Sequence, residues 1–382
     1  MKIIEVNSPT TIKEFTQLPF KIYKKDENWI PHLKQDIEKV FNPKKNKAHR
    51  HGQIIRWILT DKDNNTIGRI AAFISRKEKE SGGIGFFECI ENKDAAFLLF
   101  NTAKEWLEKK DAKWMDGPIN FGEKNMFWGL LVKNFTDQNS YSMNYNPPYY
   151  VDFFEDYGFK IYYQQFMYKR DMITPVGETF DKKHERIIQD GNYKIENVKN
   201  LTLDQIADNF RTVYNAAWGG HAHFKKMEEK TARIIMKNLK PIYDPEIIVF
   251  VYYKTKPIAF YVNIPELNEI FKYVNGNLNW LGKLIFLYHK IRKTPKTMVG
   301  IVFGVDKEYQ SKGIEGAMVK WSQDHFTANT NYNETVLTWV GDFNPKMLKV
   351  CENLGAEIYR TYHTYRYLFD REKPFKRCPV IE

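Results

Sequence analysis

Hydrophobic and polar positions along the 382 residues follow one order of patterns twice. In each part a helical spacing is followed by two β-rich runs joined by a polar turn, and then by strand, helix, strand, helix and strand. The first hairpin is expected at residues 54–59 and 67–75, and the second at residues 247–253 and 257–264. This order predicts two similar units, each with a mixed, mostly antiparallel sheet flanked by helices.

The repeat is clearest where a helix ends at a glycine before a Tyr-rich strand. Residues 154–158 and 351–355 share the pattern x-Glu-Asp/Asn-x-Gly, with their glycines 197 residues apart. Asn-Pro precedes each pattern, at residues 146–147 and 344–345. We therefore predict an α+β fold with a duplicated domain. The expected division is 1–171, a linker at 172–189, a second copy at 190–370 and a tail at 371–382.

Composition and charge narrow the class of protein. The 43% of hydrophobic residues suffice for two cores, which excludes a disordered chain. The net charge of +11 is spread along the chain, whereas nucleic-acid binders concentrate it in a stripe or tail. A diffuse positive field suits an anionic small molecule.

The three cysteines form no CxxC pair, so neither a disulfide scaffold nor a zinc site is expected. No metal is predicted at any other position. The sequence has no apolar signal segment and no run long enough to span a membrane, so we expect a cytoplasmic protein.

The most informative segment runs from residue 301 to residue 318, where a β-rich run enters a turn that opens a helix. The amides at such a helix start, together with the helix dipole, favour phosphate groups. Gly313 and Gly316 allow the backbone to approach a ligand closely.

This turn resembles the acyl-CoA motif of GNAT-type N-acetyltransferases, Arg/Gln-x-x-Gly-x-Gly/Ala. Gln310 and Gly313 match the motif, and Glu315 stands where the family has a small residue. The resemblance implies acetyl-CoA or acyl-CoA as co-substrate, bound by the second copy. The residues implied in its binding are Phe303, Val305, Gln310, Ser311, Lys312, Gly313, Ile314, Glu315, Gly316 and Asn344.

Four polar residues are candidates for catalysis. GNAT enzymes often carry a Tyr four residues before the closing Gly, and Cys351 stands there in the second copy. The thiol is a candidate proton donor or nucleophile, although a lone helical Cys is more often part of a core. His221 and Glu266 are candidate general bases. Asp342 is a candidate to orient an acceptor amine, or to cap the following helix.

The first copy has Glu91 and Asp94 where the second has its glycine-rich turn, so we expect no CoA site there. Its Gly-Phe-Phe-Glu run at residues 85–88 and the loops 117–122 and 145–150 resemble a bacterial family of tandem GNAT-like proteins. That resemblance spans nearly the whole chain.

The expected function is transfer of an acyl group from acyl-CoA to the amine of a small molecule or peptide, with the acceptor in the cleft between the copies. Two alternatives stay open. One is an aminoacyl-tRNA-dependent transferase of the peptidoglycan-peptide type, which is the only reading with a nucleic-acid partner. The other is a non-catalytic binding protein on a decayed GNAT fold.

Overall fold

The computed structural model of the protein describes residues 1–219 and 225–381. Its elements form two halves joined by α5 (Glu178–Gln189). The first half contains β1 (Lys2–Glu5), α1 (Pro9–Ile22), α2 (Lys34–Phe41), β2 (Gly52–Thr60), β3 (Thr66–Ser75), β4 (Glu78–Cys89), α3 (Lys93–Glu108), β5 (Trp114–Gly117), β6 (Leu130–Lys133), α4 (Tyr150–Tyr157) and β7 (Lys160–Asp171). The second half contains β8 (Tyr193–Asn197), α6 (Leu203–Trp218), α7 (Glu229–Leu239), β9 (Ile248–Tyr253), β10 (Lys256–Pro265), α8 (Asn268–Phe271), α9 (Trp280–Ile291), β11 (Thr297–Val305), α10 (Ile314–Asn329), β12 (Glu334–Gly341), α11 (Pro345–Asn353) and β13 (Glu357–Leu368).

The two halves repeat strand, helix, helix, three strands, helix, strand, helix and strand. Each half adds a piece that the other lacks. The first half adds β6 and its loops between β5 and α4, and the second adds α8 and α9 between β10 and β11. The expected α+β fold with two tandem units is confirmed, whereas the boundaries at residues 171 and 190 stay a prediction.

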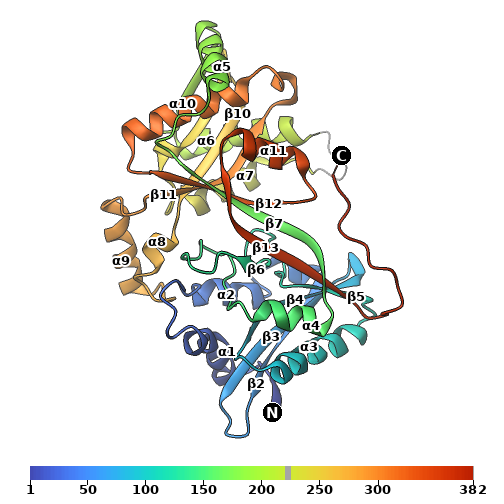
Figure 1. Ribbon diagram of the computed structural model, residues 1–382. Coiled ribbons are helices and arrows are strands. Elements are labelled where there is room, and N and C mark those ends of the chain that lie inside the picture. Colours follow the sequence, from blue (N-terminus) through green and yellow to red (C-terminus); the bar gives the residue numbers. More distant parts are fainter. Residues whose placement is uncertain (220–224, 382) are drawn as a thin grey trace.

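The strands form one continuous sheet in the order β1-β2-β3-β4-β5-β13-β7-β12-β11-β10-β9-β8, with β6 paired to β13. The centre of this sheet contains an exchange of strands (Figure 1). β7, the last strand of the first half, pairs with β12 of the second half, and β13 pairs with β5 of the first half. β7 and β13 also pair with each other in antiparallel orientation. The sheet is therefore continuous across the two halves. Counted from either edge, it begins with the first five strands of one half on this path and continues with the last strand of the other half.

Local sequence explains where several helices begin and end. Gly158 and Gly355, which follow α4 and α11, have φ angles of 103° and 67°, a region that glycine adopts without steric cost. The side chain of Asn344 accepts a hydrogen bond from the Met347 N–H and caps α11. At the start of α3 the side chain of Asn92 accepts a hydrogen bond from the Ala95 N–H and caps the helix.

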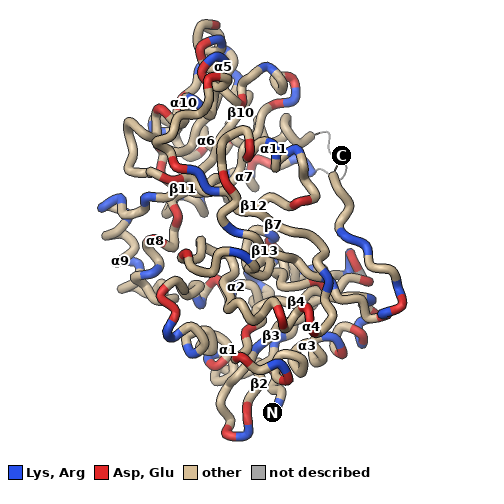
Figure 2. The backbone as a smooth tube through the Cα atoms, viewed as in Figure 1, with Lys and Arg blue, Asp and Glu red and all other residues tan. Residues whose placement is uncertain are grey.

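Helices cover both faces of the sheet in each half. Phe15 of α1 and Ile37 of α2 pack on one face of the first half, and α3 and α4 cover the other face. In the second half α6 and α7 lie on one face and α10 on the other. Basic and acidic residues are distributed over both halves (Figure 2).

Candidate functional site

A cavity of about 600 Å³ lies in the second half, where β11 and β12 separate. Residues of β11, β12, α5, α10 and α11 line it, together with Trp218 at the end of α6. Most of the lining is apolar, contributed by side chains such as Met298, Phe326, Val340 and Met347. Apolar clefts with a few polar groups are the usual binding sites for small molecules.

The separation of the two strands exposes backbone to this cavity. β11 and β12 pair in parallel from Thr297 to Gly300 and no further. On its other edge β11 stays paired with β10 as far as Val305, with a bulge at Ile301. In the described chain, no strand pairs with the cavity edge of β11 beyond Gly300. Its peptide groups are therefore accessible to an extended ligand.

The turn after β11 ends at the first residue of α10. Gly313 precedes the helix with φ +84°, and Ser311 also has a positive φ of 61°. The side chain of Gln310 donates a hydrogen bond of 3.1 Å to the Val305 carbonyl, which ties the turn to the strand. The free N–H groups of the first helical turn provide a positive end.

Two cations of α5 lie against this helix start. A Cβ atom on Gly316 would meet Lys183 Cδ at 2.5 Å, and one on Gly313 would meet Arg186 Nη2 at 2.6 Å. Arg186 also donates to the Lys312 carbonyl. The helix start therefore combines free amides, glycines and two positive side chains.

The residues expected to bind the cofactor divide into two groups. Phe303, Val305, Gln310, Glu315 and Gly316 line the cavity. The other five, which do not line it, are Ser311, Lys312, Gly313 and Ile314 in and after the turn, and Asn344, which caps α11.

The three candidate catalytic residues that the structure describes, Glu266, Asp342 and Cys351, do not meet at one point. Cys351 lines the cavity and is fully buried, and burial raises the pKa of its thiol to about 11. The thiol is therefore protonated at neutral pH, which disfavours a role as nucleophile. Asp342 forms an ion pair with Arg377 of the C-terminal tail instead of lining the cavity. His221 lies outside the described residues.

Glu266 joins the two halves. Its Oε1 accepts hydrogen bonds from the Tyr141 N–H at 2.9 Å and the Asn268 N–H at 3.0 Å. Burial raises the pKa of its carboxyl group. Since Glu266 does not line the cavity, its contacts indicate a role in holding the first-half loop against β10.

The first half fills the corresponding gap between β4 and β5. These strands pair in parallel from Ser81 to Gly83. Beyond that point the Ile119 N–H donates to the Ile84 carbonyl at 2.8 Å, and the Tyr150 hydroxyl accepts from the Cys89 N–H at 2.7 Å. Backbone groups that stay open in the second half are thus occupied in the first, and the absence of a CoA site there stays a prediction.

Sequence reasoning missed several polar groups around the cavity. Ser322 on α10 is 2% exposed, and its hydroxyl has no hydrogen-bond partner in the described chain. Gln323 receives the Val176 N–H and donates to the carbonyls of Met172 and Thr174, which fixes the segment leading to α5. The segment expected to be a linker, residues 172–189, contains α5. Lys183 and Arg186 are three residues apart, and this helical spacing could have indicated the helix from the sequence.

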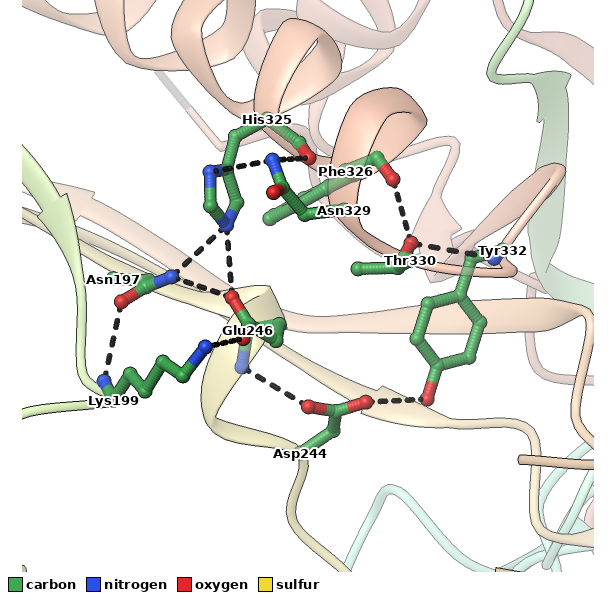
Figure 3. Close-up of polar contacts among 9 residues, drawn as sticks. All are labelled: Asn197, Lys199, Asp244, Glu246, His325, Phe326, Asn329, Thr330 and Tyr332. Carbon is green, nitrogen blue, oxygen red and sulfur yellow. Dashed lines mark hydrogen bonds and ion pairs between the residues drawn. The ribbon is translucent and has the colours of Figure 1, made fainter. Parts of the chain in front are cut away.

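A second polar cluster lies at the far end of α10 (Figure 3). His325 Nε2 lies 3.0 Å from Glu246 Oε2, and Lys199 Nζ lies 2.9 Å from Glu246 Oε1. Of the nine residues drawn, only Phe326 lines the cavity. This cluster therefore acts as a link between α10 and the strands β8 and β9.

Within the described residues, no group of three or more His, Cys, Asp or Glu side chains is placed to hold a metal ion. No helix of the described chain is long and apolar enough to cross a membrane.

Comparisons of sequence identify two relatives of similar length. The chain is 27% identical to the bacterial ceramide synthase of Caulobacter vibrioides over 375 residues, which cover 96% of this chain and 97% of the relative. It is 24% identical to protein YghO of Escherichia coli over 366 residues, covering 93% and 92%. No family model matches.

Comparisons of structure identify proteins with the same architecture. A tandem GNAT protein from the clavulanic acid biosynthesis pathway superposes with a TM-score of 0.54 at 9% identity, covering 96% of this chain and 98% of the other. A GCN5-related glucosamine N-acetyltransferase region of a fungal multidomain β-N-acetylglucosaminidase gives 0.56 at 12% identity over 96% of this chain. The chain spans 38% of that fungal protein. The protein therefore has the tandem GNAT fold.

Proposed function

We propose that the protein is an N-acyltransferase that moves an acyl group from acyl-CoA to an amine, with the thioester bound in the second half. The observation that carries this proposal is the cavity between β11 and β12, which leads to the glycine-rich start of α10. An open strand edge suits the amide groups of the pantetheine arm. The helix start with Lys183 and Arg186 suits the pyrophosphate.

The apolar lining favours an acyl chain longer than acetyl. Met298, Phe326, Val340, Met347 and Val350 offer hydrocarbon contacts to such a chain. The name of one relative, bacterial ceramide synthase, suggests the class of acceptor. A ceramide is the amide of a fatty acid and a long-chain amino alcohol, so the amine acceptor in such a reaction is a long-chain amino alcohol. We therefore propose a long-chain acyl donor and a long-chain amino alcohol as acceptor.

The groups of the chain contribute binding and orientation. Free N–H groups on the cavity edge of β11 polarise the thioester carbonyl, and the cavity holds the amine close to that carbonyl. His221, which lies outside the described residues, stays our candidate for the base that removes the proton of the amine. Cys351, with its raised pKa, is assigned to the cavity wall.

The test combines product analysis with a pair of matched variants. Purified protein is incubated with a long-chain acyl-CoA and a long-chain amino alcohol, and release of the CoA thiol and formation of the amide are measured. Lys183→Glu should weaken acyl-CoA binding about tenfold or more, because it reverses a charge at the phosphate end. Lys182→Glu, one residue away and 76% exposed, should leave binding unchanged.

Three outcomes distinguish the proposal from its alternatives. Amide formation supports it. If the protein retains a tRNA species in native mass spectrometry and forms an amide only from an aminoacyl-tRNA, it is an aminoacyl-tRNA-dependent transferase. If no donor is retained or consumed, the fold serves binding alone.

A further inference from the structure

α9 presents an unusually apolar surface. Six of its twelve side chains are large, apolar and exposed, whereas the whole described chain has eighteen such side chains. The six are Trp280 (73% exposed), Leu281 (51%), Leu284 (55%), Leu287 (50%), Tyr288 (53%) and Ile291 (72%). Their spacing of one, three, three, one and three residues places them on one face of the helix.

The opposite face of α9 fixes the helix to the protein. Ile285 and Phe286 pack against a cluster that contains Leu267 and Phe271. The Asn279 side chain caps the helix by accepting a hydrogen bond of 2.9 Å from the Gly282 N–H. The exposed apolar face is therefore held rigidly at the edge of the molecule (Figure 1).

The charged residues of the segment that carries this face all have one sign. Residues 272–296 contain six Lys or Arg and no Asp or Glu, and none of the six forms an ion pair within the described residues. The six are Lys272, Lys283, Lys290, Arg292, Lys293 and Lys296. Along α9 the trace carries basic and uncharged residues only (Figure 2).

We propose that α9 docks the protein on the surface of a membrane that contains anionic lipids. A basic helix with Trp and Leu on its apolar face is the usual form of an interfacial helix, and Trp and Tyr favour the interface. Twelve residues span about 18 Å along the axis, too short to cross the hydrocarbon core, so the helix lies in the plane of the surface. Anionic headgroups neutralise the six cations.

A second copy of the chain fits this surface less well. A twofold dimer brings the same patch of each copy together. The cations of this segment would then lie close to those of the second copy, with no carboxylate in either segment to compensate. Charge complementarity therefore selects the anionic lipid surface.

The docked helix adjoins the strand that lines the cavity. Only five residues separate Ile291 from the start of β11 at Thr297, and Met298 lines the cavity. The proposal does not depend on acyl transfer, because it rests on the exposure and charge of α9 alone.

The test is sedimentation of the full-length protein with vesicles. Wild type should bind vesicles of phosphatidylcholine with phosphatidylglycerol and bind pure phosphatidylcholine much more weakly. Leu284→Gln combined with Leu287→Gln should lower the vesicle affinity roughly tenfold or more, as should Lys283→Glu combined with Lys293→Glu. All four side chains are exposed, so these variants should fold like wild type.

Matched controls use exposed residues elsewhere. Ile234→Gln on α7, where the side chain is 49% exposed, and Lys62→Glu in the β2–β3 turn should bind vesicles like wild type. Equal binding of wild type to neutral and anionic vesicles would overturn the proposal, as would α9 variants that bind like wild type. If wild type does not bind vesicles but forms a dimer in sedimentation velocity, and the α9 variants are monomers, the apolar face binds a second copy of the chain and the proposal is overturned.

Discussion

The length of the acyl chain provides a direct test of the cavity. Its lining is largely apolar, so each methylene transferred from water should add up to about 0.8 kcal/mol of binding free energy. Since about 1.4 kcal/mol is tenfold in affinity, each methylene should tighten binding by up to about fourfold. Acetyl-, butyryl-, hexanoyl-, octanoyl- and dodecanoyl-CoA, compared by isothermal titration, should show affinity rising until the cavity is full.

A variant that narrows the cavity makes this test specific. Val319 on α10 lines the cavity, and Val319→Phe adds a ring to its wall. The rise in affinity should then stop at a shorter chain, while acetyl-CoA affinity changes little. Ala328→Phe, on an exposed position of the same helix, should reproduce the wild-type series. Affinities that do not depend on chain length, or a Val319→Phe series parallel to wild type, would refute the assignment of the cavity to the acyl chain.

Three further predictions concern charge and backbone. Glu315→Gln should tighten CoA binding by up to about tenfold at low salt, because it removes a negative charge at the phosphate end. The matched control is Asp94→Asn, which changes the equivalent second residue of α3 and should leave CoA affinity unchanged in the same titrations. Gly313→Ala should lower the free energy of unfolding in urea by about 1–2 kcal/mol, since φ is +84° there, and an unchanged midpoint would contradict this. Burial favours a higher pKa for the Glu246 carboxyl group, but hydrogen bonds from Lys199 and His325 outweigh it and hold the pKa below its usual value. The resulting stabilisation is present above the pKa of the unfolded chain and is lost as pH falls through the folded-state pKa, so Glu246→Gln should flatten the acid side of the stability profile in thermal melts.

Local sequence patterns predicted the positions of helices and strands better than they predicted which strands pair with each other. The helix–glycine–strand junctions at Gly158 and Gly355 were recognisable because a left-handed residue after a helix has a clear sequence preference. The exchange of β7 and β13 was not, because a strand with alternating side chains looks the same whichever strand it pairs with.

Two features of the candidate site were hidden for other reasons. The expected linker contains α5, whose importance comes from its contact with the start of α10, a contact between distant residues. Glu266 was a candidate base from its residue type alone, whereas its hydrogen bonds to the Tyr141 and Asn268 N–H groups depend on residues distant in sequence or on a turn, which a pattern of residue types does not show.

The exchange of strands has a consequence for how the chain folds during synthesis. The first half lacks a neighbour for one edge of β5 until β13 has been synthesised, and β13 is formed by residues 357–368. An emerging first half therefore exposes an unpaired strand edge while about 200 further residues are translated, a state that favours pairing with other chains. A ribosome-bound or truncated fragment ending near residue 200 should thus depend on chaperones and should aggregate when they are absent.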